Sequence, residues 1–213
     1  MHYTKEEIEN LSKVKRLNLI NSISGIKPAN LIGTISSEEQ SNLAIFSSIV
    51  HLGSNPALLG FILRPTIDVP RHTYQNILDN SCYTINHVTA AHTHQAHYTS
   101  AKFDKHISEF EACGFTEEYL FGFNAPFVKE SKIKMGMKFK EAIPIQSNNT
   151  VLIIGQVHHL VIPENVMNAE GQLDLDKADN AGISGLNTYY SLTKVANYPY
   201  ARVHELPKFN SKQ

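Results

Sequence analysis

The chain has 213 residues, 42% of them hydrophobic, and a formal net charge of −1, which suits one domain with a real core. The near-neutral charge provides no general field for attracting nucleic acid or an anionic membrane surface. Two cysteines without metal or redox spacing, and a charged stretch over residues 1–19 without a long apolar run, favour a cytoplasmic protein with no membrane partner.

The N-terminal segment predicts a helix that begins at Thr4. Thr4 is a good N-cap, and Glu7 three residues later completes a capping-box pattern. Lys13, Lys15 and Arg16 are typical of a solvated face, and residues 18–27 predict a loop or short helix. We expect residues 1–29 to form a helical extension of a single domain that covers residues 1–213.

Three strands and a helix are predicted next. Residues 30–36 and 42–51 read as a hairpin around a polar turn, and residues 57–63 are apolar enough for a strand buried on both faces. A helix is then predicted with Thr73 as its N-cap and with Tyr74, Ile77 and Leu78 on one face.

The rest of the chain is again rich in strand signals. Residues 82–88 alternate as in a strand, residues 90–103 predict helix or part loop, and Gly114 suits a helix C-cap after Cys113. Alternation over 132–140 predicts a strand whose lysines face water, and residues 150–162 predict a long strand with a bulge at Gly155. Many strands with few short helices indicate a mainly β barrel with peripheral helices.

One cluster of polar residues suits an anion. Two serines lie within an apolar strand, an arginine ends the next strand, and three polar residues begin the helix: Ser47, Ser48, Arg64, Arg71, His72 and Thr73. A guanidinium can bind phosphate oxygens with two hydrogen bonds, and a helix start offers free N–H groups and partial positive charge. The residues alone leave an ordinary alternative open, namely a polar strand face, a strand-end arginine and a capped helix.

Four histidines fall within eleven residues, at His87, His92, His94 and His97. His92 and His94 would point to opposite faces of a strand, or about 200° apart around a helix. No Cys, Asp or Glu lies among residues 87–102, so we expect structural or ligand-contacting histidines rather than a metal site. Glycine patterns typical of a Rossmann site, a phosphate-binding loop or a hydrolase nucleophile are absent from the sequence.

The order of several segments resembles the flavin reductase-like family, which has an FMN-binding split β-barrel and includes flavoredoxins and NAD(P)H:flavin oxidoreductases. The resemblance extends over residues 31–202. The matching segments are residues 42–47, 54–61, 64–65, 71–77, 83–87, 96–102 and 184–190.

This resemblance implies a homodimer with FMN in a cleft between the subunits. The strand serines, the arginines and the helix start would bind the phosphate and ribityl chain, and the backbone of residues 42–46 would lie along the isoalloxazine ring. Tyr189 could instead pack in the core or at an interface rather than contact the flavin. The implied cofactor-binding residues are Asn42, Leu43, Ala44, Ile45, Phe46, Ser47, Ser48, Arg64, Arg71, His72, Thr73, His97, Ser100, Lys102 and Tyr189.

The activity implied by the resemblance is hydride transfer from NADH or NADPH to the flavin, with a downstream electron acceptor or monooxygenase as a partner. The cofactor carries that chemistry, so no catalytic acid, base or nucleophile is expected. Two alternatives stay open: an FMN electron carrier without NAD(P)H turnover, and a non-enzymatic flavin- or haem-binding protein of the same fold.

Overall fold

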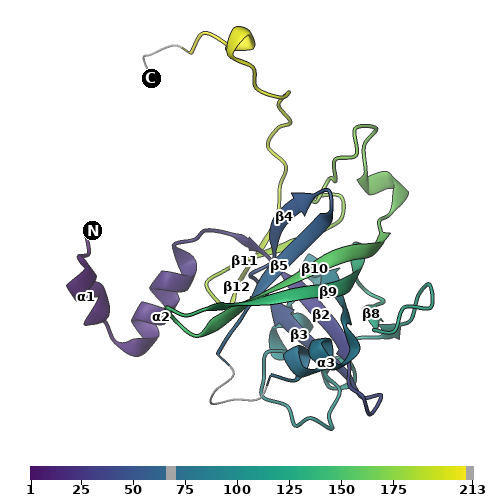
Figure 1. Ribbon diagram of the computed structural model, residues 1–213. Coiled ribbons are helices and arrows are strands. Elements are labelled where there is room, and N and C mark those ends of the chain that lie inside the picture. Colours follow the sequence, from purple (N-terminus) through teal and green to yellow (C-terminus); the bar gives the residue numbers. More distant parts are fainter. Residues whose placement is uncertain (66–70, 210–213) are drawn as a thin grey trace.

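The computed structural model describes residues 1–65 and 71–209 and shows a mainly β protein with peripheral helices, as the sequence predicts (Figure 1). The main sheet has seven antiparallel strands in the order β3-β2-β6-β9-β10-β5-β4. Its strands are β2 (Asn30–Ile35), β3 (Ser41–Phe46), β4 (Val50–Ser54), β5 (Ala57–Leu63), β6 (Cys82–His87), β9 (Lys134–Ile145) and β10 (Thr150–Val161).

Two smaller sheets and several helices surround the main sheet. The small sheets are β1-β11-β12 and β7-β8. Their strands are β1 (Lys27–Pro28), β7 (Glu117–Glu118), β8 (Phe127–Val128), β11 (Ala181–Ser184) and β12 (Thr188–Ser191). The α-helices are α1 (Lys5–Glu9), α2 (Lys13–Ser22), α3 (His72–Asn80), α4 (Thr93–Tyr98) and α5 (Glu109–Cys113), and short 3-10 turns cover residues 90–92, 164–166 and 203–205.

The main sheet is forced to curl by a short connection between its two edges. Strands β3 and β4 are opposite edges, yet only residues 47–49 separate them in the chain. Six inter-strand spacings would place the edges of a flat sheet roughly 29 Å apart, whereas the four steps from Phe46 to Val50 span at most about 14 Å. The sheet therefore closes towards a barrel at this corner.

Ser48 attaches the corner to the neighbouring strand. Its hydroxyl accepts a hydrogen bond from the Ile62 N–H at 3.1 Å and donates one to the Ile62 carbonyl at 3.2 Å. The prediction of one strand over residues 42–51 is therefore wrong. The apolar run continues, but the chain leaves one edge of the sheet at Phe46 and joins the other at Val50.

Helix α3 begins two residues earlier than predicted, with Arg71 as its N-cap. Thr73 is consequently not the N-cap: it lies inside the helix, 6% exposed, and its hydroxyl accepts from the Asn42 amide at 3.1 Å. Asn76 donates to the Thr34 hydroxyl at 3.0 Å, whereas Leu78 is exposed rather than buried. Polar contacts with β2 and β3 thus decide which face of α3 is inward.

Other sequence predictions have mixed outcomes. The Thr4–Glu7 capping box, the Gly114 C-cap and the irregularity at Gly155 are all confirmed. Helix α2 ends at Ser22, within residues 18–27, for which a loop or short helix was expected. Lys134 does not face water: it is 6% exposed and forms an ion pair with Glu118, because β9 is a central strand that is buried on both faces at its start.

Two apolar clusters hold the main sheet from either side. Alternate residues of β2 point to different clusters, with Leu31 in one and Ile32 in the other. The barrel interior contains Ile32, Phe61, Tyr83 and Ile153, and the outer cluster joins Leu43 to helices α4 and α5 and to β11. Gly155 is required inside the barrel, because a Cβ there would lie 2.1 Å from the Tyr83 hydroxyl.

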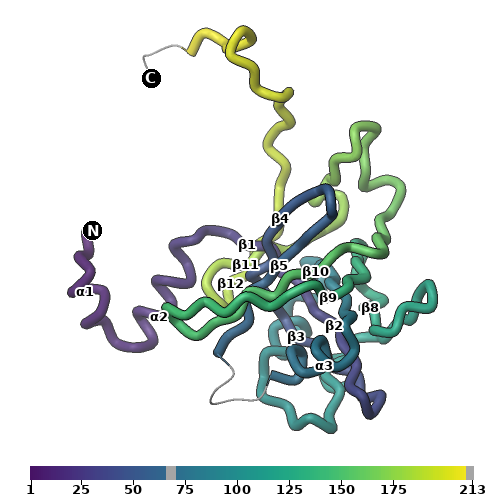
Figure 2. Tube along the Cα trace, viewed as in Figure 1, coloured from purple at the N-terminus to yellow at the C-terminus, as the bar shows by residue number. Residues whose placement is uncertain are grey.

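The two ends of the chain lie away from this body (Figure 2). Helices α1 and α2 contain no buried residues, and residues 195–209 are exposed throughout. Among the described residues, no helix combines the length and the apolar character needed to cross a membrane.

The corner contact gives a stability prediction. Ser48→Ala removes both hydrogen bonds to Ile62 and should lower the free energy of unfolding by about 1–3 kcal/mol, measured by urea denaturation. Ser47→Ala is the matched control, since no described residue bonds to the Ser47 hydroxyl, and it should change stability by less than about 0.5 kcal/mol. Equal stabilities for the two variants would show that the corner does not depend on Ser48.

Candidate functional site

Strand β3 is an open edge whose backbone groups alternate in direction. The Leu43 N–H points away from β2 and donates to the Glu109 carboxylate at 2.9 Å. The alternation of an antiparallel ladder gives Ile45 the same outward direction, while Asn42, Ala44 and Phe46 pair with β2. Within the described chain the Ile45 N–H has no acceptor, so this edge offers a ligand one backbone donor and one acceptor. The backbone of residues 42–46 was predicted to lie along a flavin ring. Only alternate residues of this segment can present polar backbone groups outward.

Glu109 is a site residue that the sequence analysis missed. It is 6% exposed, and burial raises its pKa, while its hydrogen bonds to the backbone of Leu43 and to its own N–H, and the nearby His72, act in the opposite direction. The carboxylate therefore fixes the edge strand beside the start of α3. An acidic residue in the first turn of a helix is explained by its favourable interaction with the helix dipole. The neighbouring sequence therefore gives no sign that Glu109 bonds to a strand distant in sequence.

The start of α3 has the groups that an anion needs. The carbonyl of Arg71 accepts from the N–H groups of Tyr74 and Gln75 at 2.9 and 3.1 Å. Within residues 1–65 and 71–209, no side chain caps this nine-residue helix and the N–H groups of His72 and Thr73 have no acceptor. Arg71 donates through Nε to the Pro65 carbonyl at 3.3 Å, which leaves the ends of its guanidinium fork for a ligand.

The remaining predicted anion residues lie near the corner of the sheet. Ser48 uses its only hydroxyl hydrogen on Ile62, so in this conformation it supports the strand pairing rather than donating to a ligand. Ser47 is half-buried at the same corner, and Arg64 is exposed just after β5. Arg64 directly precedes residues 66–70, which are outside the described part, and no described contact joins it to Arg71.

A second group of predicted residues forms around His97. Its Nδ1 lies 3.2 Å from the Tyr189 hydroxyl, and the two rings are perpendicular with centroids 5.9 Å apart. Burial raises the pKa of Tyr189 to about 12, which keeps it a neutral phenol. Tyr189 and Ile45 pack against the same apolar cluster. Ser100 donates to the His97 carbonyl at 2.7 Å, and Lys102 is exposed further along the segment.

The structure thus brings the predicted residues together as two groups along β3. At one end, Asn42 joins the strand to Thr73 and the free N–H groups of α3. At the other, Ile45 packs against the same apolar cluster as Tyr189, which is paired with His97. A ligand with an anionic end and a flat ring carrying polar edges suits this arrangement.

The remaining histidines have separate surroundings. His92 Nδ1 lies 2.7 Å from the Thr89 hydroxyl, His94 packs edge-on against Tyr98, and His87 contacts the Asn180 amide. Within residues 1–65 and 71–209, no group of three or more His, Cys, Asp or Glu side chains is arranged to hold a metal ion.

The chain was compared with known proteins. A model of the flavin reductase like domain matches residues 26–177. A split-barrel structure from Shewanella frigidimarina NCIMB 400, proposed to be a flavin reductase, is 47% identical with a TM-score of 0.91 and covers 94% of this chain and 100% of that one. No curated protein matches the chain.

Two more distant structures share the fold. Component B of nitrilotriacetate monooxygenase from Bacillus cereus has 17% identity and a TM-score of 0.81, covering 93% of this chain and 98% of that one. An FMN-binding protein from Thermus thermophilus has 13% identity and a TM-score of 0.66, covering 82% and 91%. The mainly β split barrel predicted from the sequence is confirmed.

His87 gives a prediction about pH. Burial lowers its pKa to about 4 from the ordinary 6.5, so the unfolded chain binds a proton between these values that the folded protein does not. Stability should therefore fall as pH falls from 6.5 to 4, by roughly 3 kcal/mol from this group. His87→Gln should flatten the pH dependence of the urea midpoint in this interval. His158→Gln is the control, because that side chain is exposed; equal slopes in both variants would contradict the assignment.

Proposed function

The chain belongs to the flavin reductase like domain family, and from this premise we propose that it binds FMN and reduces it by hydride transfer from NADH or NADPH. The observation that carries the proposal is the start of α3, where Arg71 and two N–H groups without an acceptor among residues 1–65 and 71–209 lie next to the open edge of β3. This feature suits an anion, and it adjoins a strand edge that can bind the polar edge of a flat ring.

The residues present fit the phosphate end of FMN. Arg71 provides a charge-assisted donor, and the His72 and Thr73 N–H groups point to the same helix end. Ser47 adds a hydroxyl with no described partner at the nearby corner. A single anion site of this size supports FMN over a dinucleotide flavin, and the Thermus thermophilus protein with the same fold is described as FMN-binding.

The other end fits the ring. Ile45 offers a backbone donor and acceptor, and the neutral Tyr189 hydroxyl lies beside His97. When bound, the flavin supplies the hydride-accepting chemistry. This chain's residues hold the phosphate, orient the ring along β3 and cover it from the side of α4. Hydride transfer requires no acid or base from these residues, so we assign no catalytic residue.

We also propose that the protein works as a homodimer in the cytoplasm and that residues 1–213 form one domain with a helical extension at 1–29. Exposed apolar side chains at both ends of the chain support the dimer. The two buried free thiols, Cys82 and Cys113, are compatible with a reducing compartment. The fold shared with the Bacillus cereus monooxygenase component supports an electron acceptor or monooxygenase as the downstream partner.

The activity is tested by the visible spectrum of the purified protein. We expect FMN in the denatured extract, and we expect anaerobic addition of NADH or NADPH to bleach the flavin absorbance. FMN that stays oxidised with both nucleotides would indicate an electron carrier instead. An extract containing FAD or haem, or no FMN uptake on titration, would contradict the binding proposal.

The phosphate site is tested with two ligands. Arg71→Ala removes a charge-assisted hydrogen bond worth roughly 1.5–3 kcal/mol, so FMN affinity should fall about ten- to a hundred-fold by fluorescence titration. Riboflavin lacks the phosphate, and its affinity should barely change. Lys105→Ala, which removes an exposed cation outside the site, is the matched control. Equal losses for FMN and riboflavin would place the phosphate elsewhere and make Arg71 a support of the fold.

A further inference from the structure

Helix α2 and the residues after it present an apolar strip that nothing described covers. Val14, Leu17 and Ile20 are 69%, 40% and 44% exposed, and Ile23 follows at 70%. Helix α1 has five residues and α2 has ten, and neither buries a residue. Helices this short are marginal in water unless another surface packs on them. We call Val14, Leu17, Ile20 and Ile23 the α2 strip.

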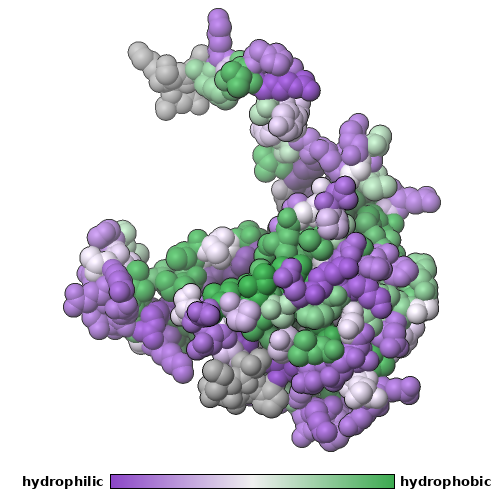
Figure 3. All heavy atoms as spheres, in the orientation of Figure 1, coloured by the Kyte–Doolittle hydropathy of each residue, from purple (hydrophilic) through white to green (hydrophobic). Residues whose placement is uncertain are grey.

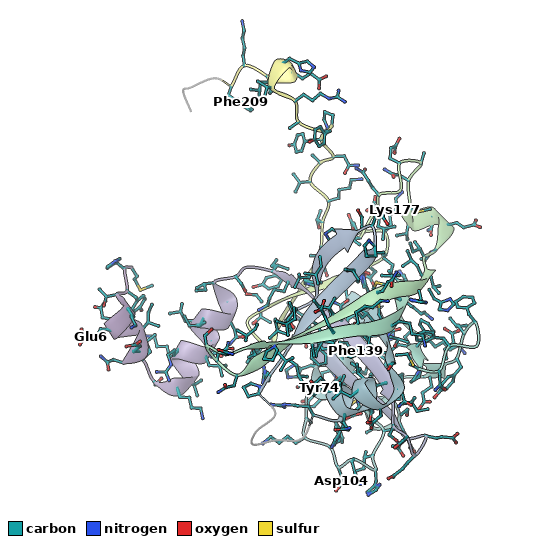
Figure 4. The ribbon with its side chains drawn as sticks, in the orientation of Figure 1. Glu6, Tyr74, Asp104, Phe139, Lys177 and Phe209 are labelled. Atoms are coloured by element: carbon teal, nitrogen blue, oxygen red, sulfur yellow. The ribbon has the colours of Figure 1, made fainter. Side chains whose placement is uncertain are left out.

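The C-terminal segment has the same property. Residues 195–209, here called the arm, leave the body as an extended chain (Figure 1), and Figure 4 shows Phe209 at its far end. Six large apolar side chains project from it with exposed fractions of 63% or more. They are Val195, Tyr198, Tyr200, Val203, Leu206 and Phe209. In the space-filling view, hydrophobic residues gather near α2 and occur at a few points along the otherwise hydrophilic arm (Figure 3).

The arm is fixed to its own chain only at its root. Lys194 forms an ion pair with Asp174 at 3.4 Å, and the Asn197 amide donates to Gln172 at 3.2 Å. Beyond Asn197, the described hydrogen bonds and ion pairs stay within the arm, between residues 202 and 205. The root therefore sets the direction of the arm, while its apolar side chains stay 63% or more exposed.

We propose that the arm of one protomer packs on the α2 strip of a second copy of this chain, and that the second arm packs reciprocally on the first copy. The proposal rests on the homodimer of the proposed function. Each chain carries one uncovered arm and one uncovered strip. In a two-fold symmetric dimer the same arm-to-strip contact forms twice, so both arms and both strips are covered.

The area available is sufficient for a stable dimer. Tyr198, Tyr200 and Phe209 can each bury about 150–250 Å², so two arms provide roughly 900–1,500 Å² before the helix side is counted. Specific interfaces bury about 1,200–2,000 Å² in total. Tyrosines are also over-represented among the residues that dominate interface energies.

The contact would connect the partner to the candidate site. Helix α2 continues into β1, which pairs with β11, and β11 pairs with the strand that carries Tyr189. An arm seated on α2 therefore stabilises the segment that leads into this small sheet. Neither α2 nor the arm contributes a residue to the proposed flavin contacts, so the two proposals can fail separately.

Photo-cross-linking tests the location of the arm. A photoreactive benzoyl-phenylalanine replaces Tyr200 in the full-length, FMN-loaded protein, which is then mixed with an isotopically heavy wild-type chain and allowed to exchange subunits. We expect cross-links from the light arm to heavy peptides within residues 13–26, identified by mass spectrometry. The same replacement at Tyr119, which is 52% exposed on the body, is the control and should not label these peptides. Cross-links confined to the light chain's own peptides, or to other heavy peptides, would overturn the proposal.

A variant without the aromatic side chains tests the energetics. The triple variant Tyr198→Ser, Tyr200→Ser and Phe209→Ser should raise the dimer dissociation constant by about 100-fold or more in sedimentation experiments. Tyr119→Ser should leave it unchanged. The melting temperature and FMN binding of the triple variant show whether its body still folds; both should be unchanged, since the three side chains are 80% or more exposed. An unchanged dissociation constant would overturn the arm contact and leave the proposed reductase intact. A monomeric wild type that binds FMN would overturn both the arm contact and the dimer.

Discussion

The shape of this protein depends on the three residues that connect opposite edges of one sheet. Because residues 47–49 cannot span a flat seven-stranded sheet, β3 and β4 have to approach each other, and Ser48 fixes the join through both backbone groups of Ile62. The curl that results encloses Phe61, Tyr83 and Ile153 in the barrel. It also leaves β3 with one unpaired side, which creates both an aggregation hazard and a place for a ligand.

The chain protects this edge without closing it. Glu109, on α5, accepts a hydrogen bond from the Leu43 N–H. Hydrogen bonds to the backbone offset the effect of burial on the carboxylate. Helix α3 is fixed over the same strand by the bond from Asn42 to Thr73, so its start remains at the Asn42 end of the strand that carries the outward backbone groups of Ile45. The same constraint that curls the sheet therefore places an anion-binding helix end and an open strand edge side by side.

The sequence predicts those features that local residues decide. The bounds of β5, the capping box at Thr4, the Gly114 C-cap and the bulge at Gly155 all follow from short patterns. The corner at residues 47–49, the buried Lys134 and the inward position of Thr73 do not, because their partners are distant in sequence. For the candidate site, the resemblance identified His97 and Tyr189 separately, but their contact depends on the packing of α4 against the small sheet. Glu109 could not be identified as a site residue from the sequence, because an acid in the first turn of a helix is already explained by the helix dipole.

The join between the main sheet and the small sheet is unusually polar, which bears on how firmly Tyr189 is held. Asn30 is 1% exposed and both of its amide atoms lack a partner among the described residues, as does the Asn180 oxygen. His87 is the cross-strand neighbour of Asn30, contacts Asn180 and has to remain neutral. Each unpaired buried group costs about 1–3 kcal/mol, so polar pairing alone does not hold this join. The outer apolar cluster compensates, because Ala29, Val88, Ala181 and Ile183 pack on both sides of it. The position of Tyr189 against the outer apolar cluster consequently depends on packing from the same small sheet that α2 adjoins.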